Sequence, residues 1–243
     1  MRRKLAAAVT ALGAALLSAA TPAWAEDKLT YSFTPQGTSD YIFRGLSYSS
    51  EKPAAQAYVE LDYNIFYAAI WTSRTDYLGV YGPWEFDVFL GARPVTGPIT
   101  WDVGVWWYNF GSKDPVLTSG DLDYFELKLG ASITPVKNMT LNVTGYYTPD
   151  QDLAVVDTKT VEGSLSYVLP DVGQFSPTVS GLVGWSGSDT DGFFLGAKDY
   201  VYWNGGLKLN VDKFFMDFRY WDTTINHDFA DERFVVTVGV SVP

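Results

Sequence analysis

The chain contains no cysteine and only one histidine, His227, among its 243 residues. The absence of cysteine excludes a disulfide scaffold, a thiolate metal site and a cysteine nucleophile. Hydrolytic chemistry usually needs a histidine base beside a serine, or a metal, and this lone histidine falls in a predicted loop, residues 225–228. We therefore expect that the protein is not an enzyme and holds no metal or cofactor.

Basic residues are also scarce, because 17 Lys and Arg stand against 28 Asp and Glu, for a net charge of −11. Proteins that bind nucleic acid carry a basic patch, so no nucleic-acid partner is expected. The chain is nevertheless 47% hydrophobic and 16% aromatic, which is too apolar for a disordered protein. Its length suits a single β domain.

Long hydrophobic runs are missing beyond the N-terminus, so no transmembrane helix, which needs about 20 apolar residues, is expected there. The N-terminus itself has basic residues at 2–4, an uncharged stretch over 5–20, and the small-x-small pattern of a signal peptidase site at 23–25. We expect residues 1–25 to be a secretory signal peptide and residues 26–243 to form one domain.

Apolar and polar residues alternate with period two through the rest of the chain, as in strands with one polar face. For example, Glu126 and Lys128 alternate with Leu127 and Leu129. This pattern predicts about twelve strands, over residues 30–46, 54–63, 66–75, 84–93, 99–109, 122–134, 139–148, 158–169, 178–187, 198–210, 214–222 and 232–242.

Shorter and longer connections alternate between these strands. The short ones are residues 64–65, 94–98, 135–138 and 211–213, with 170–177 somewhat longer. Between these come the longer connections, residues 47–53, 76–83, 110–121, 149–157, 188–197 and 223–231. Outer-membrane barrels have short periplasmic turns on one rim and long outside loops on the other. The sequence therefore predicts an all-β fold: a closed, antiparallel, up-and-down transmembrane β-barrel in the bacterial outer membrane.

A conspicuous motif lies near the mature N-terminus, Ser39-Asp40-Tyr41-Ile42-Phe43-Arg44-Gly45-Leu46-Ser47. It resembles the N-terminal signature of the TorF family of proteobacterial porins, and similar stretches follow at residues 66–71, 102–108 and 231–236. The resemblance covers essentially the whole mature chain. It implies a small Gram-negative outer-membrane barrel that acts as a pore.

Charged residues on the inward faces of these strands would line the pore, because a barrel lumen is wet while a lipid-facing Arg or Lys at the midplane costs about 2–4 kcal/mol. The acidic candidates are Asp40, Glu60, Asp62, Glu85, Asp87, Asp102, Glu126, Glu162 and Asp217. The basic candidates are Arg44, Arg74, Arg93, Lys128, Lys198, Lys208, Arg219 and Arg233. The two signs nearly balance, and the excess negative charge falls in the longer loops.

Two arrangements of these charges are open. They could form opposed ladders that select solutes by charge, or they could pair across a narrow lumen and close it. Barrels of about eight strands have an interior filled by side chains, and barrels of about 16–18 strands enclose a channel. A barrel of about twelve strands lies between them, so the strand count does not show whether the lumen is open.

The expected function is passive diffusion of small solutes or ions, with a weak preference for cations caused by the acidic loops. The alternatives are a non-conducting surface or adhesin barrel and, less favoured, an outer-membrane lipid hydrolase that uses His227. Expected partners are outer-membrane lipid, lipopolysaccharide and the barrel assembly machinery.

Overall fold

The computed structural model describes residues 29–77, 81–112, 123–151 and 156–242. The predicted signal peptide, residues 1–25, lies outside the described residues. No helix within the described ranges has the length and apolarity needed to cross a membrane.

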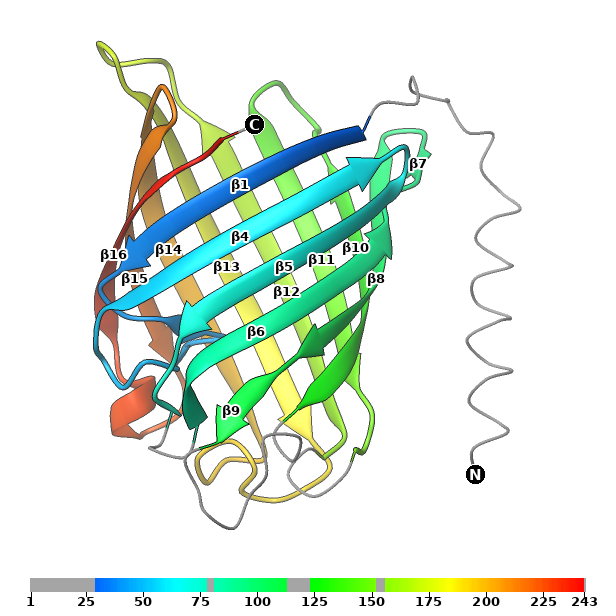
Figure 1. Ribbon diagram of the computed structural model, residues 1–243, viewed down its shortest axis with the longest axis vertical. Coiled ribbons are helices and arrows are strands. Elements are labelled where there is room, and N and C mark those ends of the chain that lie inside the picture. Colours follow the sequence, from blue (N-terminus) through cyan, green and yellow to red (C-terminus); the bar gives the residue numbers. More distant parts are fainter. Residues whose placement is uncertain (1–28, 78–80, 113–122, 152–155, 243) are drawn as a thin grey trace.

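Twelve long antiparallel strands form the protein, which confirms the predicted count and fold class (Figure 1). They are β1 (Leu29–Thr38), β4 (Ala54–Tyr63), β5 (Phe66–Arg74), β6 (Tyr81–Ala92), β8 (Ile99–Tyr108), β10 (Tyr124–Ile133), β11 (Met139–Thr148), β12 (Thr158–Val168), β13 (Ser176–Ser188), β14 (Asp199–Val211), β15 (Phe214–Thr223) and β16 (Arg233–Val240). Four short strands accompany them: β2 (Ile42–Phe43), β3 (Leu46–Ser47), β7 (Val95–Thr96) and β9 (Phe110–Ser112).

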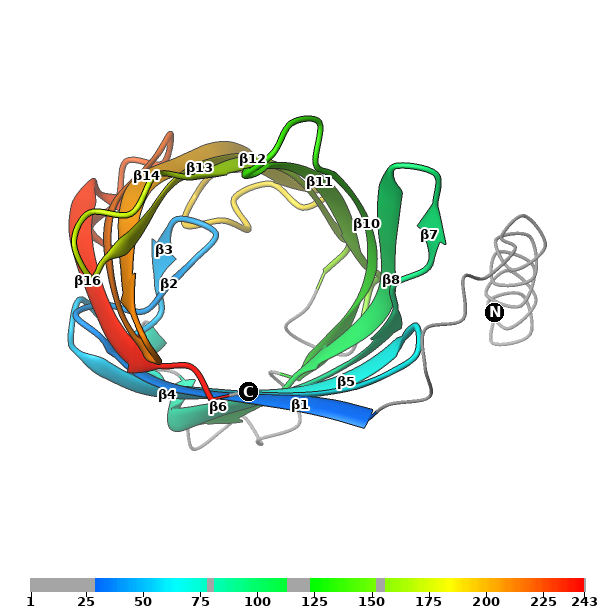
Figure 2. The same ribbon diagram turned by 90° about the horizontal axis from the view of Figure 1, so that it is seen from above.

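The sheet closes on itself, so that Figure 2 shows a ring when the barrel is seen along its axis. Each long strand pairs with its neighbours in the chain, and the first long strand pairs with the last through Gln36–Gly239, Gly37–Val238 and Thr38–Thr237. Closure gives each long strand a paired neighbour on both sides, as a sheet that stands in hydrocarbon requires.

Period-two alternation sorts the side chains between an apolar outside and a polar inside. On β4, Val59, Leu61 and Tyr63 are exposed on the outer face, whereas Glu60 and Asp62 point inward and meet Arg93. Large exposed hydrophobic residues recur on the outer face of every long strand. An exterior of this kind matches the apolar band that an outer-membrane barrel presents to lipid.

The two rims differ as the sequence predicted. Tight connections, among them 64–65 and 212–213, join strands at the upper rim in Figure 1. Leu29, which pairs with Tyr63 beside the 64–65 turn, lies at the same end. Asn64 and Asp212 take positive φ angles of 55° and 50° there, a conformation that Asn and Asp tolerate in tight turns. The described parts of the longer loops lie at the opposite rim, and we call the two ends the short-turn rim and the long-loop rim.

The first strand is a correction to the sequence analysis. Residues 30–46 were expected to form one strand, but β1 ends at Thr38. Residues 39–53, which we call the inward loop, turn into the barrel and form the β2–β3 hairpin inside the ring (Figure 2).

The apolar exterior can be tested by placing one charge on each face. Leu129 is 47% exposed on the outer face of β10, and we expect Leu129→Arg to destabilise the barrel in phospholipid vesicles by about 2–4 kcal/mol. Denaturant unfolding in vesicles measures this cost. Asn142→Arg, on the inner face of β11, is the matched control and should cost much less. Equal costs would contradict the assigned faces.

Candidate functional site: the barrel lumen

Fifteen of the seventeen predicted lumen residues point into the barrel. Thirteen of them come from the wall: Glu60, Asp62, Glu85, Asp87, Arg93, Asp102, Glu126, Lys128, Glu162, Lys208, Asp217, Arg219 and Arg233. Asp40 and Arg44 come from the inward loop rather than from a wall strand. This placement concerns position only, and a role in conduction stays a prediction.

The two remaining residues do not line the lumen. Arg74 is exposed at the end of β5, where Tyr67 and Ser73 are the inward residues and Arg74 falls on the outer face. Lys198 precedes β14 in a rim loop and pairs there with Asp191, their charged atoms 3.2 Å apart. Removing both from the basic set leaves acidic side chains in excess inside the barrel, in place of the expected balance.

A network of ion pairs covers one wall of the lumen toward the short-turn rim. Arg93 donates to Glu60 at 2.8 and 2.9 Å and to Asp62 at 3.0 Å. Lys128 donates to Asp102 at 2.6 Å, and the Arg93 guanidinium lies 3.7 Å from the same carboxylate. These charges neutralise one another along one wall, so they do not close the lumen from side to side.

The opposite wall carries a smaller group on β14 and β15. Arg219 contacts Asp217 at 3.0 Å and donates to the Asn204 side chain. The Lys208 ammonium lies 4.0 Å from the centroid of the Phe215 ring, a cation–π distance. Both groups face water in the half of the lumen near the short-turn rim.

The inward loop folds around a two-residue turn. Arg44 and Gly45 have φ angles of 51° and 82°, so both turn residues are left-handed, as a type I′ hairpin requires. A Cβ at Gly45 would lie 2.4 Å from Thr223 Cγ2 and 2.8 Å from Tyr202 Cβ. Glycine is therefore required both by the backbone conformation and by the close approach to the barrel wall.

Arg44 anchors the tip of the hairpin to the wall. Its Nη1 and Nη2 each lie 2.8 Å from a carboxylate oxygen of Glu126, which is 1% exposed. Tyr108 and Thr148 also donate to this carboxylate, at 3.0 and 2.8 Å, so its oxygens are fully used. Burial alone would lower the pKa of Arg44, but the Glu126 carboxylate outweighs burial and the pKa is raised well above its ordinary value.

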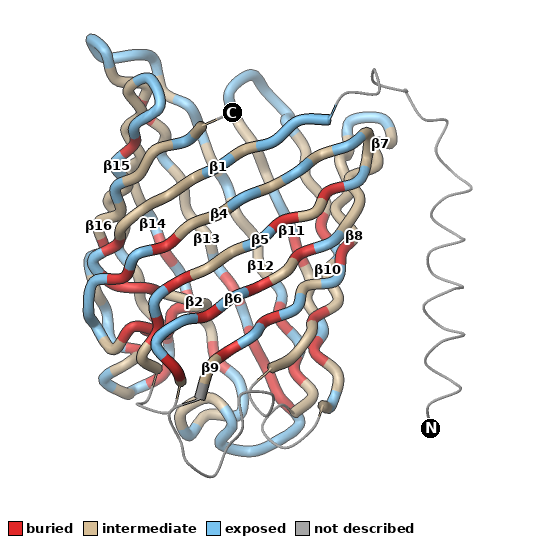
Figure 3. Tube along the Cα trace, in the orientation of Figure 1, coloured by how far each residue is buried: buried red, intermediate tan, exposed pale blue. Residues whose placement is uncertain are grey.

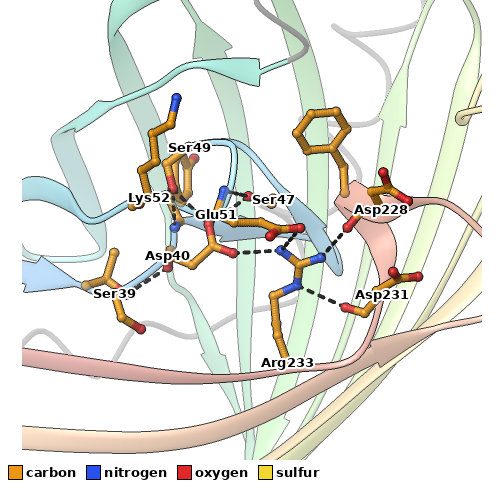
Figure 4. Close-up of polar contacts among 12 residues, drawn as sticks. Ser39, Asp40, Ser47, Ser49, Glu51, Lys52, Asp228, Asp231 and Arg233 are labelled. Atoms are coloured by element: carbon orange, nitrogen blue, oxygen red, sulfur yellow. Dashed lines mark hydrogen bonds and ion pairs between the residues drawn. The ribbon is translucent and has the colours of Figure 1, made fainter.

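Asp40 anchors the base of the loop (Figure 4). Its Oδ1 accepts hydrogen bonds from Ser47 and Ser49 at 2.7 and 2.8 Å, and its Oδ2 lies 2.8 Å from Arg233 Nη1. Arg233 also donates to the backbone oxygen of Asp228 at 2.8 Å. One arginine on β16 therefore ties the inward loop to the loop that precedes its own strand.

Aromatic rings fill the space around the loop. Tyr48 stacks on Tyr77 with 4.4 Å between ring centroids, Phe43 lies 5.7 Å from Tyr108, and other rings extend the cluster. Burial raises the pKa of Tyr77 to about 12 and that of Tyr48 well above its usual value. These tyrosines therefore stay neutral, and the cluster behaves as an apolar core inside the barrel.

Burial differs between the two halves of the lumen, and Figure 3 shows the buried residues gathered toward the long-loop rim. Tyr202 and Ser47 are 0% exposed there. Beyond the loop, a cavity of about 390 Å³ opens between Gln36 and Gln56 on one side and Lys208 on the other, with Tyr41 of the inward loop at its border. The long-loop half is therefore filled, and the short-turn half is hollow.

The sequence analysis missed the inward loop, although the sequence held one signal for it. Arg44-Gly45 can form a two-residue hairpin turn, but the flanking strands are two residues long and give no readable alternation. The motif that carried the family resemblance is thus the segment that enters the lumen.

His227 has a structural role in this fold. Its Nδ1 accepts a hydrogen bond of 3.2 Å from the backbone N–H of Phe229 and caps the 3-10 helix η3 (Asp228–Ala230). The two rings also stack, with centroids 5.5 Å apart. A nitrogen used in this way is poorly placed to act as a general base.

Comparisons with known proteins find barrels of the same fold. The KdgM porin matches 87% of this chain and 98% of its own, with a TM-score of 0.57 and 8% identity. The NanC porin matches 87% of this chain and 99% of its own, with a TM-score of 0.56 and 12% identity. LpxR from Salmonella typhimurium matches 86% of this chain and 99% of its own, with a TM-score of 0.51 and 8% identity. Identities this low show a shared fold and nothing finer.

A comparison with curated proteins gives no match. The resemblance to the TorF family is named by none of the matches and stays a prediction. A family model does match residues 23–241, which is most of the chain. On that match, the chain belongs to the bacterial family described as "Bacterial protein of unknown function (Gcw_chp)".

Proposed function

We propose that the protein is a porin-like channel of the bacterial outer membrane, which passes small solutes or ions and is plugged from the long-loop side by its inward loop. The observation that carries this proposal is the combination of an apolar exterior with a charged, hydrogen-bonded interior around a cavity of about 390 Å³. An open, charge-lined half of the lumen supports a transport role.

The setting follows from the same features. The apolar exterior would contact outer-membrane lipid and lipopolysaccharide. The barrel assembly machinery would insert the protein into the membrane. Short turns face the periplasm in outer-membrane barrels, so the plugged end faces outward and the hollow half opens toward the periplasm. Membership of the TorF-type porins fits this picture and is part of the proposal.

A plug formed by one loop differs from both arrangements that the sequence leaves open. Ion pairs such as Arg93–Glu60 run along the wall, so they leave the lumen hollow. Arg44 and Asp40, by contrast, tie the inward loop to walls at Glu126 and Arg233. Occlusion therefore depends on one loop held by two largely buried ion pairs, and displacing that loop opens the channel.

Loss of the Arg44 anchor should open the channel. Arg44→Ala leaves the Glu126 carboxylate buried without its cation, and breaking a buried pair in this way costs about 3–5 kcal/mol. We expect larger and more frequent stepwise currents in planar bilayers than the wild type gives.

Lys52→Ala is the matched control in the same loop. Its ion pair with Asp76 is solvent-exposed, with 67% of the lysine side chain accessible, and exposed pairs contribute about 0–1 kcal/mol. Its currents should equal those of the wild type. If the wild type and Arg44→Ala are both silent although folded, as judged by heat-modifiable migration on a gel, the non-conducting surface barrel becomes the better description.

Ion selectivity should favour cations weakly. Acidic side chains outnumber basic ones inside the barrel, and the loop before β16 adds Asp228, Asp231 and Glu232 at the mouth. A negative mouth concentrates cations, and salt screens this effect. The reversal potential of Arg44→Ala in a potassium chloride gradient should have the sign of cation preference and shrink at high salt. A reversal potential of the opposite sign would refute the assignment.

A further inference from the structure

Two neighbouring lumen carboxylates on β6 form no ion pair with any basic side chain of the described residues. Glu85 and Asp87 point inward from the same strand face, and each is 1% exposed. The ion pairs in the described part of the lumen all involve other acids, and Glu85 Oε2 is buried there without a hydrogen-bond partner. Asp87 receives one backbone hydrogen bond of 3.3 Å, from Asn109.

The groups around the pair are themselves acidic or neutral. They are Tyr41 and Tyr48 of the inward loop, Tyr81 of β6, Asp123 before β10, and Tyr124 and Glu126 of β10. Arg44, the basic residue of this region, is bound in bidentate fashion to Glu126. The pair therefore has no basic neighbour among the described residues that could neutralise it.

Two buried negative charges side by side, without a counter-ion, are too costly to persist. A shared proton removes one charge and turns one acceptor into a donor. That donor would also give the buried Glu85 Oε2 a hydrogen-bond partner. A metal ion fits less well, because no group of three or more metal-binding side chains occurs among the described residues.

We propose that Glu85 and Asp87 form a proton-binding site that holds the inward loop in place, so that the channel is plugged while the pair carries its proton and released when the proton leaves. This proposal rests on the proposed channel function. It adds the proton as a ligand and states that loss of the proton opens the channel.

Tyr41 links the site to the loop. Its side chain is 8% exposed, interacts with Glu85 and lies 6.2 Å from the Trp71 ring. Tyr41 is also joined through the backbone to Asp40, the residue that pairs with Arg233. A second negative charge in the pair would draw in water, and water can reach this position only if Tyr41 and the loop move away.

The sign of the effect follows from proton linkage. Raising the pH removes the shared proton, which is bound in the plugged state, so high pH favours release. A single proton can change the ratio of open to plugged channels by at most about tenfold per pH unit. Because the plug lies at the long-loop rim, the pH outside the cell would be the relevant one.

The test is the pH dependence of conductance in planar bilayers between pH 5 and 9. The wild type should open more at high pH. Glu85→Gln supplies a permanent donor to Asp87 and cannot ionise, so its channel should stay plugged at all pH values. Asp87→Asn gives an independent second variant, and heat-modifiable migration checks that each is folded.

Asp217→Asn is the matched control, because it neutralises a lumen carboxylate that pairs with Arg219 in the other half of the barrel. It should keep the pH dependence of the wild type. A wild-type pH profile in both Glu85→Gln and Asp87→Asn would overturn the proposal. A wild-type conductance that does not change with pH but changes with added calcium would indicate a metal ion in place of the proton. That result would also overturn the proposal.

A second measurement separates this proposal from the channel function. The chain has no cysteine, so Leu46→Cys places a single thiol on the inward loop, where Leu46 is 4% exposed. Its modification rate by a methanethiosulfonate reagent, divided by that of the exposed reference Lys52→Cys, should rise with pH and stay flat when Glu85→Gln is added.

The outcomes of the two measurements are distinguishable. Accessibility that responds to pH in a barrel without currents would keep the proton site and discard the channel. Accessibility that ignores pH would discard the proton site and leave the channel proposal intact.

Discussion

Every backbone N–H and C=O group of this chain has to be satisfied without help from water wherever the chain meets lipid. A sheet meets that condition only if it closes, and the pairing of β1 with β16 is the contact that closes this one. The other features follow from closure. Alternate side chains must enter an enclosed space, where Glu60 and Asp102 can be neutralised by Arg93, while their neighbours Val59 and Val103 stay outside.

Much of this arrangement could be predicted from the sequence, because lipid and water impose a repeating rule on each strand. The period-two pattern placed Asp102 and Glu126 correctly on the inner face, and alternating connection lengths separated the rims. The rule fails where strands end. Arg74 and Lys198 lie at such places, and there the next loop decides where a side chain points.

The inward loop could not be predicted by that rule, since its β2–β3 hairpin pairs with no strand of the wall. Its position depends on contacts between residues far apart in the sequence, such as Arg44 with Glu126 and Tyr200 with the backbone oxygen of Arg44. Local alternation carries no information about such contacts. The β2–β3 hairpin is also too short to bury a face of its own, so the barrel wall supplies its core.

The location of the inward loop has a consequence for the order of assembly. The loop follows β1 directly, and Asp40 reaches across the seam to Arg233 at the start of β16. A barrel built from sequential hairpins brings its first and last strands together at the end, and only then do these two residues meet. The inward loop therefore plugs the lumen in the same step in which β1 pairs with β16. No segment has to enter a barrel that has already closed.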